Sequence, residues 1–543
     1  DIANVRARIM NGGDMWWDAV TQTGPKYEVP IGSGKHSLFS GAIWIGGLDA
    51  SNQLHVAAQT YRQSGTDFWP GPCGSDSSTC LLYDRVWKIN KQDVINFIAG
   101  APATPDMISY PGNYPNGQPL APFVDVDGNG IYNSAAGDYP DFGLSGSPNC
   151  CDILHGDQAI WWVINETGNN HTETGGASFG LEIQCQAFAF NSTDADLNNT
   201  TFYQYKIKNC SSISFHDVYF GLWADADLGN YLDDYVGCDV PRGMGYVYNG
   251  DSIDEGPTGY GLHPPALGID FLQGPLADLN DGVDNNRNCI IDEAGEDIIM
   301  SKFVYYENSF SFWGNPSVAT DYYNYLKGNW LNNQVMTYGG AGNGTGSGAT
   351  NIPCNFMFPG NSDHQYEWGT GGNCLAPAAP QADWGEYIAG NAPFDRRMLL
   401  SVGPFTLVPS GMVNCITLAA IWVRDTNSTS PYSLAALQLA DDKIQLFFDS
   451  CYHYGSLGIQ EQENIYATVY PNPVSDILEI NFGKNISDGK FILYDIFGKA
   501  IREVGVKNKT AIKVSCKEFA AGIYVYRIIL ADGQTGSGKV VIK

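Results

Sequence analysis

Basic residues, long apolar runs and catalytic signatures are all scarce in this sequence. Its 543 residues include 29 Lys and Arg against 58 Asp and Glu, which gives a formal net charge of −29. That balance excludes nucleic acid as a partner, because binding to phosphates needs clustered basic side chains. No apolar run approaches the roughly 18–20 residues that span a bilayer, so we expect no transmembrane segment.

The usual motifs of hydrolytic enzymes are also missing. None of the eight His residues lies in an H-E-x-x-H motif, and no G-x-S-x-G elbow is present. These motifs carry the metal ligands of zinc proteases and the nucleophile of α/β-hydrolases. Their absence argues against an enzyme without excluding one, because the separation of paired carboxylates in glycoside-cleaving enzymes is set by the fold.

Cysteine, in contrast, is abundant. The chain has 13 Cys and no C-x-x-C pair, which favours disulfides formed after export over a zinc site. Cys73 and Cys80 flank a short polar loop, and Cys354 and Cys374 are also close in sequence. Both pairs are therefore candidates for local disulfides. Cys516 stands alone near the C-terminus, where we expect a buried free thiol or else an intermolecular crosslink.

Residues 1–458 have a recurring pattern of short aromatic runs separated by glycines and other turn residues. Short aromatic and β-branched runs, such as 42–45, 158–164 and 202–208, alternate with Gly, Ser, Asn and Pro, which is typical of many short strands. The sequence predicts a mainly β fold, with a multi-domain body of the β-sandwich or jelly-roll type and long loops. A subdivision near residue 150 is left open. A single convincing helix is expected from Ser433 to Phe448.

Residues 459–543 differ from the rest of the chain. They contain 11 basic and 9 acidic residues, whereas residues 1–458 contain 18 basic and 49 acidic ones. Short strands at roughly ten-residue spacing predict a small separate β-sandwich. Its motifs are Tyr470-Pro-Asn-Pro-Val474, Tyr494-Asp-Ile-Phe-Gly498, Ala521-Gly-Ile-Tyr524 and Lys539-Val-Val-Ile-Lys543.

This set of motifs resembles the type A sorting domain of Bacteroidetes type IX secretion cargo. The family pattern falls on six positions: Pro471, Asn472, Pro473, Gly498, Gly522 and Lys543. The resemblance implies an immunoglobulin-like sandwich, recognition by the outer-membrane machinery of type IX secretion, and a secreted, extracellular or outer-membrane surface location. The chain begins at Asp1 without Met, and we expect that a signal peptide has been removed.

Residues 1–458 resemble a group of large exported Bacteroidetes proteins without an assigned activity. The similarity lies in the segments 11–17, 57–62, 156–162, 223–229 and 236–239. It implies export but no particular chemistry.

Two loops have the spacing of calcium ligands. In the first, Asp125, Asp127 and Asn129 occupy positions 1, 3 and 5, Gly follows at position 6, and Ile131 would bind through its carbonyl at position 7. Asp138 or Asn133 would complete the shell. The alternative is a turn rich in Asp and Asn that holds no metal.

The second loop repeats this spacing with fewer charges. It offers Asp284, Asn286, Asn288, the carbonyl of Ile290 and Asp292, with Cys289 where Gly is expected. It resembles the calcium repeats of secreted bacterial proteins, and the alternative is a turn anchored by a disulfide. Asp225 and Asp227, followed by Asp233 and Asp234, form a third acidic cluster, which is either a cation site or a solvated loop. We expect structural calcium as the cofactor.

The leading functional hypothesis is a structural or adhesive protein of the cell surface, with a subunit of an extracellular filament or sheath as one form of it. The alternative is a secreted polysaccharide-active enzyme or glycan-binding protein. The expected partners are the type IX machinery and either further copies of the chain or a surface polysaccharide. Asp251-Ser-Ile253 resembles the O-glycosylation motif of Bacteroidetes, so Ser252 is a candidate for a glycan.

Overall fold

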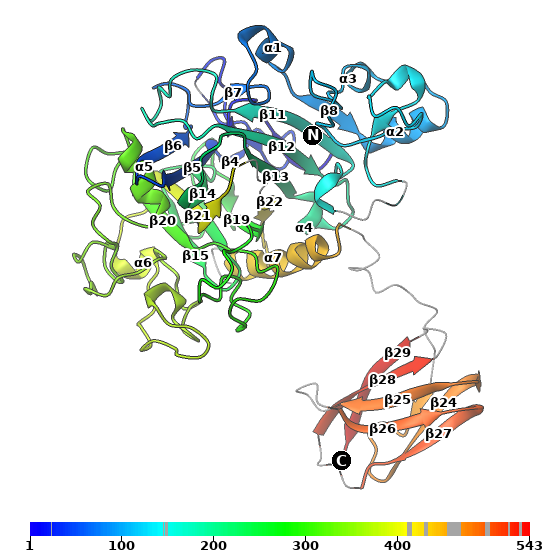
Figure 1. The fold of residues 1–543 in the computed structure, drawn as a ribbon. Coiled ribbons are helices and arrows are strands. Elements are labelled where there is room, and N and C mark those ends of the chain that lie inside the picture. Colours follow the sequence, from blue (N-terminus) through cyan, green and yellow to red (C-terminus); the bar gives the residue numbers. More distant parts are fainter. Residues whose placement is uncertain are drawn as a thin grey trace. The chain divides into compact units, whose positions relative to one another are not determined.

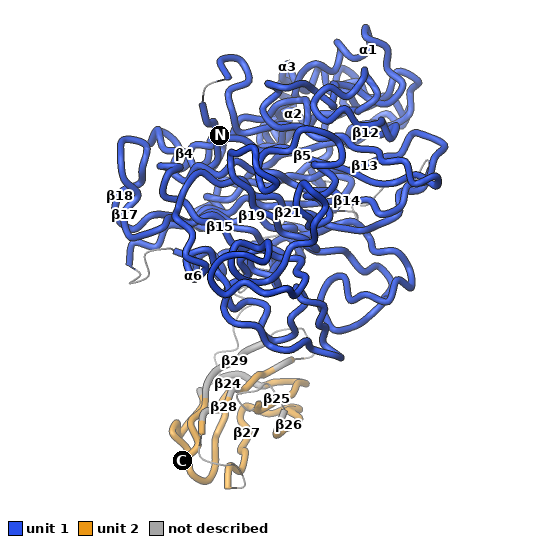
Figure 2. Tube along the Cα trace, turned by 90° about the vertical axis from the view of Figure 1, so that its left-hand side faces the viewer, with its two compact units in different colours: residues 1–452 blue, residues 453–543 orange. Residues whose placement is uncertain are grey.

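The chain divides into two compact units, a body (Asp1–Tyr452) and a tail (His453–Lys543), in a computed structural model (Figure 2). The structure describes all residues except 23, 145, 147–149, 410–414, 428–432, 453–467, 495–499, 518, 520–521 and 531–534. Both units consist mainly of antiparallel strands, which confirms the predicted β class. Among the described residues, no helix has the length and apolar character needed to cross a membrane.

The body is built on two large antiparallel sheets (Figure 1). The larger sheet contains β7 (Trp69–Pro70), β8 (Trp87–Asn90), β11 (Gln158–Asn165), β12 (Leu181–Ala189), β13 (Thr200–Asn209), β15 (Asp234–Asp239), β16 (Met244–Asn249), β19 (Ala266–Gln273) and β22 (Ile416–Val423). The smaller contains β2 (Asp14–Met15), β5 (Ser40–Asp49), β6 (Leu54–Ala58), β14 (Phe215–Ala226), β20 (Lys302–Glu307) and β21 (Arg396–Leu407).

Alternate side chains of the two sheets form one hydrophobic core. Tyr203, Tyr205 and Ile207 of β13 all belong to it, as expected for strand residues spaced two apart. The ring of Tyr205 lies 5.6 Å from that of Phe220 on β14, in the other sheet. Trp16 has no exposed surface, so it is a core residue.

Helices and short strands cover the sheets. The longest helix, α7 (Leu434–Asp449), buries Leu437, Ile444 and Phe447 and contacts β19 and β22, which confirms the helix predicted at this position. The shorter helices are α1 (Ser77–Leu82), α2 (Lys91–Ile98), α3 (Pro105–Ile108), α4 (Ala195–Asn198), α5 (Ala319–Leu326) and α6 (Glu386–Ala389). The short strands are β1 (Arg6–Ala7), β3 (Tyr27–Glu28), β4 (His36–Leu38), β9 (Phe123–Val124), β10 (Tyr139–Pro140), β17 (Ile253–Asp254) and β18 (Gly261–Leu262).

The disulfides are long-range, so the prediction of local pairing is wrong. Cys73 bonds to Cys210 and not to Cys80, and Cys374 bonds to Cys289 and not to Cys354. A third disulfide joins Cys150 to Cys451, which are 301 residues apart in sequence. Proximity in sequence did not predict the pairs because folding places these cysteines elsewhere. Cys354 is a core residue with 3% exposure. Cys73 is brought to Cys210 by the packing of distant segments around the sheet.

The tail is a small β-sandwich. Among its described residues, one sheet contains β23 (Thr468–Tyr470), β24 (Ile477–Ile486) and β27 (Lys509–Ser515), and the other contains β25 (Gly489–Tyr494), β26 (Ala500–Val506), β28 (Gly522–Leu530) and β29 (Thr535–Ile542). Leu478, Phe491 and Ile528 from the two sheets share one fully buried core. The Cys516 thiol is buried there without a disulfide, which confirms the prediction of a buried free thiol.

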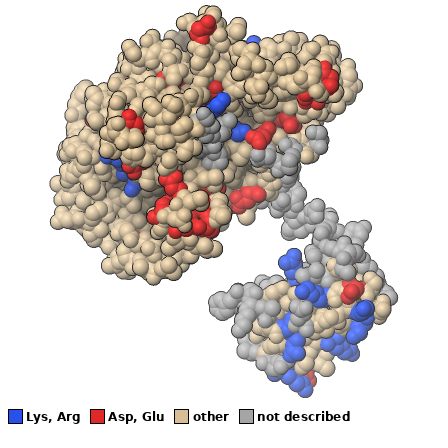
Figure 3. All heavy atoms as spheres, viewed as in Figure 1, with Lys and Arg blue, Asp and Glu red and all other residues tan. Residues whose placement is uncertain are grey.

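Charge differs between the two units. Figure 3 shows Lys and Arg spread over the visible face of the tail, whereas Asp and Glu gather in patches on the visible face of the body. This matches the acidic excess of residues 1–458 in the sequence.

Candidate functional site

A cavity of about 570 Å³ opens in the body and is lined by acidic and aromatic side chains. We call it the tyrosine cavity. The side chains that define it are Phe39, Tyr61, Glu173, Asp225, Asp227, Tyr231, Tyr306, Tyr322, Asp395 and Arg397. They come from β14, β20, β21 and α5, from the segments that follow β4, β6, β11 and β14, and from the residue before β21. Concave sites with a few convergent polar groups are the usual places for ligands.

Three carboxylates converge on one side of the cavity. Asp225 at the end of β14, Asp227 just beyond it and Asp395 just before β21 each offer an oxygen within 4.8 Å of the others. The guanidinium of Arg397 is 3.3 Å from Asp225 and 2.5 Å from Asp395, and the hydroxyl of Tyr61 donates to Asp225 Oδ2 over 2.5 Å. The guanidinium of Arg397 therefore contacts two of the three acids.

Burial leaves this cluster short of positive charge. Asp225 is only 3% exposed, and its Oδ1 has no hydrogen-bond partner. Burial, reinforced by the charge of Asp395 and opposed by Arg397, raises the pKa of Asp225 to about 6. Burial and the charges of Asp225 and Asp395 raise the pKa of Asp227 well above its usual range. A cation or a proton would stabilise these carboxylates.

A fourth acid in the cavity, Glu173, is anchored on one oxygen only. Its Oε1 accepts hydrogen bonds from Thr60 and, over 3.3 Å, from Tyr322, while its Oε2 is buried without a partner. The residue is 5% exposed, and burial raises the pKa of its carboxyl. Glu173 thus presents an unsatisfied acceptor within the cavity lining.

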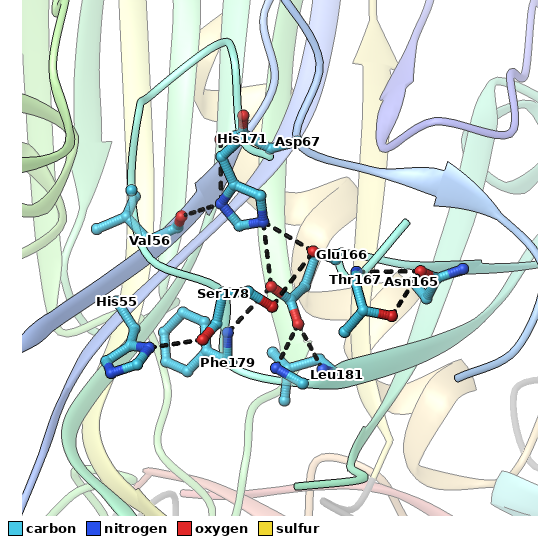
Figure 4. A network of polar contacts seen from close by, with 12 residues as sticks. His55, Val56, Asp67, Asn165, Glu166, Thr167, His171, Ser178, Phe179 and Leu181 are labelled. Atoms are coloured by element: carbon cyan, nitrogen blue, oxygen red, sulfur yellow. Dashed lines mark hydrogen bonds and ion pairs between the residues drawn. The ribbon is translucent and has the colours of Figure 1, made fainter. Parts of the chain in front are cut away.

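A buried network around His171 (Figure 4) is joined to Glu173 through Asp67. His171 hydrogen-bonds to the carbonyls of Val56 (2.7 Å) and Glu166 (2.8 Å) and lies 3.1 Å from the Glu166 carboxylate. Asp67 accepts from the backbone N–H of Glu173 over 3.0 Å. Burial lowers the pKa of His171, but its hydrogen bond to Glu166 and the charge of Asp67 outweigh this and raise the pKa to about 9. The network fixes the loop between β11 and β12.

The first predicted calcium loop joins β9 to β10. Asp125 at position 1 accepts from the N–H of Gly130 over 2.6 Å, Asp127 at position 3 accepts from the N–H of Asn129 over 3.1 Å, and Asn129 at position 5 accepts from the N–H of Ile131 over 2.6 Å. Asp125, Asp127 and the fully buried Asp138 bring oxygens within 4.8 Å of one another. The structure therefore gathers all three predicted carboxylates.

The second loop has the same hydrogen bonds at the same positions. Asp284 accepts from the N–H of Cys289 over 2.9 Å, Asn286 from that of Asn288 over 3.1 Å, and Asn288 from that of Ile290 over 2.8 Å. Cys289 has a φ of 71°, close to the 77° of Gly130 at the matching position of the first loop. The backbone thus adopts the conformation that explains why Gly is expected there.

The second loop departs from the predicted ligand set at its end. Asp292 accepts from the N–H of Gly282 over 3.1 Å, whereas Glu293 accepts from the side-chain amides of Asn286 and Asn288. Asp284 Oδ1 and Glu293 Oε2 are buried without hydrogen-bond partners. Glu293 is a better candidate ligand than Asp292, and sequence spacing alone did not single it out.

The third acidic cluster is not a solvated loop, because Asp225 and Asp234 are 3% and 0% exposed. It also splits: Asp225 and Asp227 line the tyrosine cavity, whereas Asp234 accepts from the N–H of Leu228 over 2.9 Å. Four functional candidates had no motif to reveal them, namely Tyr61, Glu173, Asp395 and Arg397. The one local signal is the charged run Asp395-Arg-Arg397, which leads into the apolar strand β21.

The remaining predicted residues lie in the tail and on a turn of the body. Pro471, Asn472 and Pro473 are exposed before β24, Gly522 begins β28, and Lys543 donates its N–H to the carbonyl of Val474 over 2.8 Å. Gly498 falls outside the described residues. Ser252 is exposed between β16 and β17, and its modification stays a prediction.

Comparison with known proteins assigns the tail. Residues 468–543 match the family described as the secretion system C-terminal sorting domain. The chain carries a type IX sorting domain. The protein is therefore type IX cargo that is secreted or held at the cell surface. No curated protein matches the chain.

A solved structure of a polysaccharide lyase matches the chain with 8% identity and a TM-score of 0.18. The match covers 71% of this chain and 35% of the lyase chain, so this chain spans about a third of the length of that protein.

Proposed function

We propose that this exported protein has an adhesive role at the cell surface and that its body binds saccharide in the tyrosine cavity. The observation that carries the proposal is the pair of unpartnered acceptors, Glu173 Oε2 and Asp225 Oδ1, on side chains that are 5% and 3% exposed. Buried polar atoms are nearly always hydrogen-bonded. Unpartnered acceptors on residues that line a cavity of about 570 Å³ favour a ligand that donates hydrogen bonds, as sugar hydroxyls do.

The aromatic lining supports the same ligand class. Tyr61 and Tyr322 donate their hydroxyls to Asp225 and Glu173, which holds both rings at the cavity, and Tyr306 lines it as well. Rings with one polar end and one apolar face suit ligands that mix hydroxyl groups with apolar patches. The carboxylates of Glu173 and Asp225 favour ligand binding, because one oxygen of each accepts a hydrogen bond from a Tyr hydroxyl and the other oxygen has no partner.

The test is binding of the full chain to an array of oligosaccharides. Wild-type protein should retain a subset of glycans, and Glu173→Gln and Asp225→Asn should lose most of that binding while remaining folded. A matched control is Asp217→Asn, which removes one acid outside the cavity. Absence of binding to every glycan by a folded wild-type protein would refute the proposal.

Cleavage of a bound polysaccharide is a second candidate, favoured by the raised pKa values of Asp225, about 6, and Glu173. A carboxyl with a raised pKa can serve as a general acid. Release of new reducing ends or unsaturated products from a bound glycan would support an enzyme, and intact glycan after prolonged incubation would leave adhesion alone.

We also propose that calcium stabilises the body and that the protein self-associates, since both suit a structural protein of the cell surface. The shared hydrogen bonds of the loops at Asp125 and Asp284, and the left-handed backbone of Gly130 and Cys289, support calcium in both. We do not extend calcium to Asp225 and Asp227, because Arg397 already lies against that cluster. Electron microscopy of concentrated protein with calcium tests for a filament, and particles that stay monomeric would exclude one.

A further inference from the structure

We propose that the tyrosine cavity selects saccharides that carry a protonated primary amine, as the hexosamine units of a deacetylated polymer do. This inference rests on the proposed saccharide binding and narrows it to one chemical class. It follows from the charge, the hydrogen-bonding capacity and the aromatic lining of the cavity.

The charge of the cavity is unbalanced. Glu173, Asp225, Asp227 and Asp395 face a single guanidinium, that of Arg397. Burying a carboxylate without a counter-ion costs free energy, so a ligand that brings positive charge gains more here than a neutral one of the same shape. Uronates and sulfated sugars would add to the repulsion and are disfavoured.

The hydrogen-bonding capacity of the cavity also matches an ammonium group. The unpartnered atoms on its deeply buried acids, Glu173 Oε2 and Asp225 Oδ1, are acceptors. An ammonium has three N–H donors and no acceptor. A sugar hydroxyl can fill one such position, but it carries a lone pair that needs a donor and leaves the charge of the carboxylate uncompensated.

The aromatic side chains favour a cation as well. Phe39, Tyr61, Tyr231, Tyr306 and Tyr322 line the same cavity as the acids. The face of an aromatic ring attracts cations, and cages of aromatic side chains bind quaternary ammonium ligands in the same way. The hydroxyls of Tyr61 and Tyr322 are already engaged with Asp225 and Glu173, so these rings are fixed before a ligand arrives.

A divalent cation fits the cavity less well. Calcium needs six to eight oxygen ligands, and the cavity gathers three carboxylates, Asp225, Asp227 and Asp395. In the cavity, Asp225 Oδ2 and Asp395 Oδ1 are both in contact with Arg397. A calcium ion bound to those oxygens would lie beside a guanidinium, whereas an ammonium would pair with Asp225 Oδ1, which is buried and has no hydrogen-bond partner.

The experiment compares two trisaccharides that differ only at the C2 nitrogen: a β-1,4-linked glucosamine trimer and its fully N-acetylated form. Binding to the full chain is measured by calorimetry at about 0.15 M salt, where the Debye length is about 8 Å, so that attraction to the acidic surface is weakened. We expect the amine form to bind at least about tenfold more tightly. A tenfold ratio corresponds to about 1.4 kcal/mol, the loss expected when N-acetylation removes one ion pair.

Variants separate the cavity from the general negative charge of the protein. Glu173→Gln, Asp225→Asn and Asp227→Asn should each reduce the preference for the amine to below about threefold. Asp217→Asn removes the same charge from an exposed site, since the Asp217 side chain is 53% exposed, and should keep the full preference. Each variant is checked for an unchanged melting temperature, and any that fails leaves the other two to decide.

The outcomes are distinct. Equal binding of the two trimers, or loss of the preference in Asp217→Asn, would overturn the inference and leave saccharide binding intact. Displacement of the amine trimer by millimolar calcium would show a metal site in its place and also overturn it. Failure of every saccharide, charged or neutral, would refute the proposed function itself.

Discussion

Asp225 and Arg397 lie opposite one another on two paired strands, β14 and β21, with 3.3 Å between Arg397 Nη2 and Asp225 Oδ2. The pairing of these strands therefore builds the ion pair at the heart of the tyrosine cavity. Both side chains are almost fully buried. The remaining acids, Asp227 and Asp395, gather around the same guanidinium, so its charge holds the cavity together.

Replacing Arg397 with Gln should destabilise the body by about 3–5 kcal/mol, because removal of one partner leaves buried carboxylates uncompensated. Urea denaturation followed by tryptophan fluorescence measures this directly, since all 13 Trp lie in residues 1–452. Arg8→Gln is the control: Arg8 pairs with Asp18 while 41% exposed, and its loss should cost less than about 1 kcal/mol. Equal effects of the two variants would contradict the role given to Arg397.

Calcium titration should reveal two classes of site. Asp125→Asn should remove the tighter class, because the first loop gathers three carboxylates, and Asp284→Asn should remove the weaker one. Each occupied site should stabilise the body by about 2.7 kcal/mol when free calcium is 100-fold above its Kd. Excess chelator should therefore lower the melting temperature of the wild type, and a chelator-insensitive melting temperature would show that the loops fold without metal.

Amine binding in the cavity should strengthen as pH rises from 4 to 6, a range in which the amine of glucosamine stays protonated. Asp225 has a pKa of about 6, and only its ionised form attracts an ammonium. The groups that face it are Asp227 beyond its own strand, Asp395 just before β21, Arg397 on β21, Tyr61 after β6 and Tyr306 on β20. Affinity should rise at most about tenfold per pH unit below that pKa. Asp225→Asn should flatten this profile, and an unchanged slope in the variant would assign the titration to another group.

The parts that sequence predicts best are those encoded in one continuous segment. The first predicted calcium loop uses only its own residues from Asp125 to Asp138, so spacing alone indicated that these carboxylates lie together. Helix α7 and the motifs of the tail are local in the same sense. In the second loop, the same spacing identified Asp284, Asn286 and Asn288, but the choice between Asp292 and Glu293 depends on how the chain folds back.

The cavity could not be predicted because its residues meet through strand pairing. Asp225 and Asp227 stood out as an acidic cluster, but Arg397 and Asp395 reach them only through the register of β14 and β21. Glu173 arrives from a loop of the other sheet. The disulfide pairs were predicted wrongly for the same reason. Cys150 and Cys451, for example, are 301 residues apart in sequence but form a disulfide in the folded protein.

His171 should make the stability of the body fall with pH in a defined window. Its pKa is about 9 in the folded protein and about 6.5 when unfolded. Because the folded value is raised, the contribution of His171 to the unfolding free energy is fully present below pH 6.5 and is lost as pH rises to 9, by on the order of 3 kcal/mol.

His171→Gln keeps a hydrogen-bonding side chain but cannot titrate. Unfolding free energies of both proteins at pH 6 and pH 9.5, measured by urea denaturation with tryptophan fluorescence, isolate His171, since every other group titrates in both. The wild type should lose about 3 kcal/mol more than the variant over this interval, and parallel losses would mean that His171 is neutral in the folded body and that its contact with Glu166 is a hydrogen bond without an ion pair.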